Sequence, residues 1–195
     1  SHPIIALPAL PVVMPLATDV IWISADGEIE QITRAIAVER LDRSQALFCH
    51  KRWTATRLGM ESTGLGALEG LDALELFAFV RPSQFCLPTA RGIGESLGLD
   101  TYGQDDDQAL LIPQACQKLL TELSELSDAN KDHAARIASM MMQGGWGWGP
   151  SVLSALGCPL PAEGPPNSRG AAVWMRLKEI PEYGGSSEPG AFPIT

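Results

Sequence analysis

Cationic and aromatic side chains cluster in one short segment of this 195-residue chain. The cluster follows an apolar run at residues 46–49 and consists of Lys51, Arg52, Trp53 and Arg57. Positive charge beside an aromatic ring is the combination that holds single-stranded nucleic acids, because cations pair with phosphates and bases stack on rings. These four residues are therefore candidate nucleic-acid contacts. The competing interpretation, which the sequence slightly favours, is a solvated loop with Trp53 in the core.

The charge of the chain is distributed unevenly. The formal net charge is −9 and the isoelectric point is about 4.7. Such a chain is a poor non-specific binder of nucleic acid, because phosphate contacts need Lys and Arg. Residues 34–57 are the exception, with six basic side chains and only two acidic ones. Any DNA partner is therefore expected to contact residues 34–57.

Three further side chains are candidates for the remnant of a pocket, namely His50, Asp72 and Glu75. A lone His at the end of an apolar run is more often a structural residue with satisfied hydrogen bonds. Asp72 and Glu75 stand three residues apart on a predicted helix. There the simpler interpretation is a favourable charge at the helix start, worth up to about 1 kcal/mol. The run at 105–107 consists of three Asp residues and predicts helix capping rather than a metal cluster, because consecutive side chains point in different directions.

Several classes of function are disfavoured by absent motifs. The four cysteines, at positions 49, 86, 116 and 158, form no Cys-x-x-Cys pair and predict a reduced, cytoplasmic protein. No apolar run reaches the roughly twenty residues of a membrane helix, so no membrane partner is expected. The chain has no Gly-x-x-x-x-Gly-Lys-Ser/Thr loop for nucleotide phosphates. We therefore expect no cofactor in this chain.

The elements that position these residues follow from periodicity and turn chemistry. Strands are predicted at residues 8–14, at 20–24 and 29–32 around an Asp-Gly turn, and at 46–49 as a buried run. Thr33 is predicted to cap a helix that ends near Leu41, and a short second helix ends at Gly59. Residues 60–70 are predicted to form a loop.

The second half of the chain is predicted to be helical. An amphipathic helix is expected over 71–80, with Leu71, Leu74, Phe77 and Ala78 on one face. Further helices are expected after Thr89, over 105–126 with Pro113 in its first turn or at a kink, over 128–143, and between Pro150 and Gly157. Trp146 and Trp148 are predicted to pack between helices, and the methionines at 140–142 are predicted to lie in a core. The expected fold class is α/β, with a sheet domain over 1–125, a helical annex over 126–157 and a Pro/Gly-rich linker over 158–195.

Two sequence patterns carry a resemblance to known families. Residues 71–76 read Leu-Asp-Ala-Leu-Glu-Leu and, followed by Arg81-Pro82, resemble a helix of DnaQ-like exonucleases. Gly92–Leu99 resembles the short helix that ends in Leu-Gly in that family, and Phe48–His50 resembles the strand end where the family places a His-Asn pair. The order of blocks at 56–59, 70–80, 146–150 and 173–177 is similar to that in the N-terminal region of alphaproteobacterial DinG-type helicases. The resemblance implies a ribonuclease-H-like sheet. It also implies a C-terminal helicase motor in the same polypeptide, and that motor would use ATP and Mg²⁺.

The chemistry of the exonuclease family does not transfer to this chain. That family clamps the reacting oxygens with two metal ions about 4 Å apart, held by an Asp-x-Glu pair and two later Asp residues, with a His as base. Here no acidic residue precedes Asp19, Thr54 lies near the second Asp position, and the stretch at 104–118 has no His. No catalytic residue and no metal ligand is therefore assigned.

Three functions stay open at this stage. The leading one is a non-catalytic accessory domain of a DNA helicase, which positions DNA or docks on the motor. The second is a protein-interaction module without nucleic-acid contact, which the acidic balance favours. The third is a metal-dependent exonuclease with relocated carboxylates, drawn from Asp19, Asp26, Asp72 and Asp105.

Overall fold

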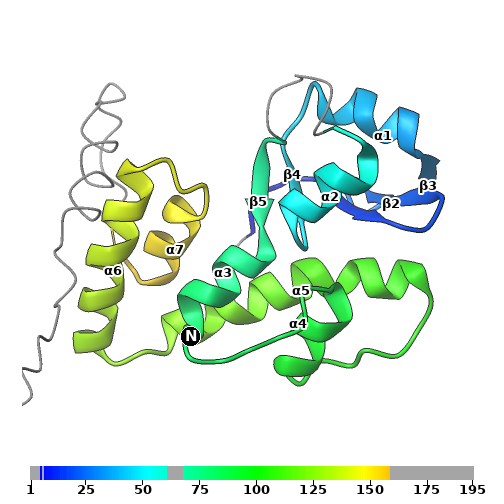
Figure 1. The fold of residues 1–195 in the computed structure, drawn as a ribbon. Coiled ribbons are helices and arrows are strands. Elements are labelled where there is room, and N and C mark those ends of the chain that lie inside the picture. The colour runs from blue at the N-terminus through cyan, green and yellow to red at the C-terminus, as the bar shows by residue number, and fades with distance from the viewer. Residues whose placement is uncertain (1–4, 6, 61–67, 159–195) are drawn as a thin grey trace, which may run out of the picture.

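The protein folds around a five-stranded mixed sheet with helices on both faces, which confirms the α/β class (Figure 1). The computed structural model describes residues 5, 7–60 and 68–158. The strands are β1 (Val12–Pro15), β2 (Asp19–Ile23), β3 (Ile29–Thr33), β4 (Ala46–Phe48) and β5 (Gly70–Asp72). The helices are α1 (Arg34–Leu41), α2 (Lys51–Leu58), α3 (Ala73–Val80), α4 (Ala90–Ser96), α5 (Asp105–Ser124), α6 (Asp128–Gln143) and α7 (Gly149–Ala155).

The sheet has the order β3-β2-β1-β4-β5. β1, β2 and β3 form an antiparallel meander, in which Val13 pairs with Trp22 and the predicted Asp-Gly turn places Gly27 at a φ of 89°. β4 and β5 continue the sheet in parallel to β1, because α1 and α2 return the chain to the starting edge. The carboxyl ends of β1, β4 and β5 consequently lie at one edge of the sheet.

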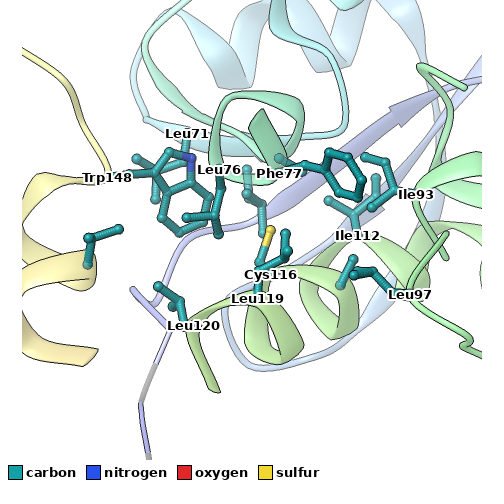
Figure 2. Packing of buried hydrophobic residues seen from close by; sticks show 14 of the residues in the cluster. Leu71, Leu76, Phe77, Ile93, Leu97, Ile112, Cys116, Leu119, Leu120 and Trp148 are labelled. Carbon is teal, nitrogen blue, oxygen red and sulfur yellow. The ribbon is translucent and has the colours of Figure 1, made fainter. Parts of the chain in front are cut away.

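Alternating side chains of the strands feed two separate apolar clusters. Val13, Trp22 and Phe48 face α1 and α2, whereas Val12 and Leu47 face α5. Figure 2 shows the larger cluster, in which side chains of α3, α4 and α5 pack together on one face of the sheet. This alternation is the period-two pattern of strands that are covered on both faces.

Most helix boundaries follow the local signals in the sequence. The Thr33 hydroxyl accepts a hydrogen bond from the Ile36 amide at 3.4 Å, and Gly59 ends α2 with a φ of 71°. The three Asp residues that begin α5 stand in its first turn, as expected for capping. Pro113 lies inside α5 rather than in the first turn, and α5 ends at Ser124 rather than at 126.

The predicted helix over 71–80 is wrong at its start, and the predicted loop over 60–70 is wrong at its end. The chain forms β5 first, and α3 begins only at Ala73. Gly70 makes this strand possible: its φ is 139°, and a Cβ atom there would lie 1.9 Å from the Ala46 carbonyl oxygen. The buried face of α3 is also different, since Ala78 is exposed and Leu76 is buried.

The last two helices pack on the larger apolar cluster, through their connecting loop and through the buried side of α7. Trp148 is fully buried in the larger cluster, as predicted, and Trp146 is half-buried, with its ring centroid 4.9 Å from that of Phe79. The expectation that the Met run at 140–142 is core is wrong for Met140, whose exposed fraction is 49%. Within the described residues no helix could span a membrane. Residues 159–195, which include most of the predicted linker, lie outside the described residues.

Buried thiols give a first testable expectation. Burial raises the pKa of Cys49 to about 12, with smaller contributions from Asp72 and Cys86, and burial also raises the pKa of Cys116. Because the thiolate is the reactive species, neither thiol should react with Ellman's reagent at pH 8 in the folded protein. Peptide mapping after labelling, with and without denaturant, measures this. Labelling of Cys116 without denaturant would contradict the packing described here.

Candidate functional site

The carboxyl edge of the parallel strands is where open α/β sheets usually place ligands. Leu16 follows β1 at this edge, His50 lies just beyond β4, and Asp72 ends β5. The sequence patterns singled out His50 and Asp72, and the sheet brings them together. The distance from His50 Nδ1 to Asp72 Oδ2 is 3.9 Å.

Asp72 is a structural acceptor that joins two helices. Its Oδ2 accepts a hydrogen bond from the Lys51 amide at 2.8 Å, at the start of α2. Its Oδ1 accepts from the amides of Leu74 at 2.9 Å and Glu75 at 3.2 Å, at the start of α3. The residue is only 6% exposed. Both carboxylate oxygens are therefore occupied by backbone donors, which is a larger role than the surface helix-start charge expected from the sequence.

His50 does not have the satisfied environment that the sequence predicts. A separation of 3.9 Å from Asp72 is too long for a hydrogen bond. Nδ1 is buried, and no hydrogen-bond partner for it lies among the described residues. The ring itself is partly exposed at the edge of the sheet. An unsatisfied ring nitrogen there leaves His50 a candidate ligand contact rather than a settled core residue.

Glu75 borders an open groove beside the edge strand β5. The groove has a volume of about 1110 Å³, and its walls include Lys51, Phe79 and Trp146. Burial raises the pKa of Glu75, and Asp72 adds to this increase. The charge of Lys51 and a hydrogen bond with Trp146 act in the opposite direction. Glu75 therefore lies where α3 meets the α6–α7 loop.

The acidic side chains of the third hypothesis are not gathered into a metal site. Within the described residues, no group of three or more His, Cys, Asp or Glu side chains is placed to hold a metal ion. Asp19 accepts a hydrogen bond from the Gln31 side-chain amide at 2.9 Å. It lies in β2, which β1 and β4 separate from Asp72 in β5. Asp26 is exposed in the β2–β3 turn, and Asp105 is exposed in the first turn of α5.

The outer face of α2 carries the cationic and aromatic cluster. Trp53 is 46% exposed, so the interpretation that places it in the core is wrong. The Arg57 guanidinium lies 5.4 Å from the centroid of the Trp53 ring, within the range of a cation–π contact. The side chain of Arg52 is exposed next to them. The spacing of Trp53 and Arg57, four residues apart on a helix, places both on one face.

The remaining basic residues of the 34–57 segment divide into two groups. On α1, Arg40 pairs with Glu30 at 2.5 Å and Arg43 pairs with Glu39 at 3.3 Å. Arg34 instead donates to the carbonyl oxygen of Ala17. Arg34 was counted in the basic segment but not singled out, because its contact with the β1–β2 turn depends on how α1 packs beside that turn. The unpaired charge of the basic segment is thus concentrated at the carboxyl edge of β1 and on α2.

Comparison with known proteins identified no relative of this chain. No family model matches the chain, and no match was found among curated proteins or among solved structures.

Proposed function

We propose that this chain is a non-catalytic accessory domain of a DNA helicase, with a ribonuclease-H-like fold, that positions single-stranded DNA for the motor. The strand order supports the fold assignment, since an antiparallel meander is extended by parallel crossover strands. The expected partners are DNA and a C-terminal helicase motor in the same polypeptide. ATP and Mg²⁺ would belong to that motor.

One observation carries the DNA-binding role: the exposed pairing of Trp53 with Arg57 on α2, beside Arg52. Exposing a large aromatic ring to water is unfavourable, and stacking an unpaired base on it would recover about 1–3 kcal/mol. Within the described residues, neither Arg52 nor Arg57 forms an ion pair. No carboxylate among the described residues therefore neutralises either charge.

The non-catalytic part of the proposal rests on Asp72. Like Glu75, it has a counterpart in the exonuclease helix that the chain resembles, and it is the buried one of the two. Its oxygens accept three backbone hydrogen bonds, at 2.8, 2.9 and 3.2 Å. Metal ligation would have to compete with these bonds and would leave the starts of α2 and α3 without their cap.

Fluorescence anisotropy with a labelled oligo(dT) strand tests the proposal. The chain should bind at low salt without Mg²⁺, and binding should weaken steeply as salt increases. The Arg52→Gln/Trp53→Ala variant should bind about tenfold or more weakly, because it loses a phosphate contact and a stacking platform. The matched control, Arg91→Gln, removes an exposed charge from α4 and should bind as the parent does.

Absence of binding at low salt would reject the DNA-positioning role and favour the protein-interaction module. The open groove beside β5 supports that second candidate, because Phe79 and Trp146 offer an aromatic wall next to Glu75. Degradation of the oligonucleotide with Mg²⁺ would favour the exonuclease hypothesis, provided that substitution of Asp19, Asp72 or Asp105 abolishes it.

A further inference from the structure

Two arginines from different helices hold the same turn. Arg34 is the first residue of α1, and Arg57 lies in the last turn of α2. Arg57 Nη2 donates to the Leu16 carbonyl oxygen at 2.9 Å, and Arg34 Nη2 donates to the neighbouring carbonyl of Ala17. Leu16 and Ala17 connect β1 to β2. Both guanidinium groups are therefore anchored at the carboxyl end of β1.

The charge of this pair is not neutralised within the described residues. Neither Arg34 nor Arg57 forms an ion pair there, whereas Arg40 and Arg43 of α1 each have a glutamate partner. Asp19 is the nearest acidic residue along the chain from the turn, and its Oδ2 accepts the Gln31 side-chain amide at 2.9 Å. Two like charges on adjacent carbonyls repel each other, so the turn favours an anion.

Both arginines also have an unsatisfied donor. The Nε atoms of Arg34 and Arg57 are buried, and no hydrogen-bond partner for either is present among the described residues. Buried donors in folded proteins almost always find an acceptor. Both guanidinium groups are thus held at the turn without a full set of acceptors among the described residues.

We propose that Arg34 and Arg57 form a phosphate-binding pair for the backbone of single-stranded DNA, an inference that rests on the proposed function and names its phosphate contact. Guanidinium groups match phosphate oxygens in a two-pronged geometry. The Trp53 ring packs against Arg57 at 5.4 Å, so a base next to the bound phosphate can stack on its exposed face. In the exonucleases that the chain resembles, metal ions supply positive charge to the phosphate. Here fixed guanidinium groups supply it.

The test compares two double variants of equal charge change. Arg34→Gln/Arg57→Gln should bind oligo(dT) about tenfold or more weakly than the parent. The slope of log affinity against log salt should decrease by about 1.4, since the two arginines would contact two neighbouring phosphates and each single-strand phosphate contact contributes about 0.7. Arg40→Gln/Arg43→Gln removes the two paired arginines of the same segment and should keep both the affinity and the slope within error.

The pattern of results separates this inference from the proposed function. If the parent binds and the two double variants weaken binding equally, or if the salt slope is unchanged, the phosphate pair is rejected and the DNA role stands. If the parent does not bind, the DNA role is rejected, and the inference with it. Should the double variant fail to fold, Arg34→Gln alone decides, because it leaves the Arg57–Trp53 contact in place. A slope lower by about 0.7 supports the pair, and an unchanged slope overturns it.

Discussion

Replacing Asp72 with alanine is expected to lower the free energy of unfolding by about 3 kcal/mol or more. The substitution removes the acceptor for three backbone amides, those of Lys51, Leu74 and Glu75. Each amide left unsatisfied in a buried place costs about 1–3 kcal/mol, and water entering the edge of the sheet recovers part of that loss. Urea unfolding followed by circular dichroism measures the effect, with an unchanged m-value as the sign of a change in stability alone.

Two variants show whether the effect comes from the double cap. Asp72→Asn keeps one acceptor oxygen and should lose about half as much stability, because one of the two helix starts retains its bond. Asp106→Ala removes an exposed carboxylate from the first turn of α5 and should cost no more than about 1 kcal/mol. Equal losses for Asp72→Ala and Asp106→Ala would show that Asp72 is an ordinary surface charge.

Replacing Trp148 with alanine is expected to lower the free energy of unfolding by about 3–5 kcal/mol. The ring is fully buried between α7 and the sheet domain, and its Nε1 donates to the Asp72 carbonyl oxygen at 2.7 Å. The substitution leaves a cavity and an unpaired carbonyl at the point where the α6–α7 loop meets β5. We expect limited proteolysis to cut first in α6 and α7, because these helices lose part of the buried contact that holds them.

Controls for Trp148 use the other tryptophans of the chain. Trp148→Phe keeps most of the apolar volume and should lose about 1–2 kcal/mol, which reports the hydrogen bond and the smaller ring. Trp53→Ala removes an exposed ring and should change stability by less than about 1 kcal/mol, while it weakens oligo(dT) binding. If Trp148→Ala unfolds like the parent and α6 and α7 stay resistant to protease, the annex is held by other contacts.

Local signals in the sequence determined much of the fold. The Asp-Gly turn with alternating apolar residues predicts the β2–β3 hairpin, and the helix ends at Thr33 and Gly59 follow from capping and from the left-handed conformation. These features depend on neighbours in the chain, so sequence patterns are sufficient to predict them. β5 is different, because its three residues show no period of their own. Its pairing with β4 depends on Gly70, which fits against Ala46 in the folded sheet.

The candidate site shows the same division. By itself the sequence determined that the basic charge is concentrated in residues 34–57, and it singled out His50, Asp72 and the α2 cluster. Only the tertiary structure decided that Trp53 is exposed, that both oxygens of Asp72 cap helices, and that Arg34 and Arg57 both donate to carbonyl oxygens of the β1–β2 turn. The physical reason is distance along the chain. Exposure, shared caps and converging charges depend on segments that are brought together by the packing of two apolar clusters on the sheet, and no local pattern records that packing.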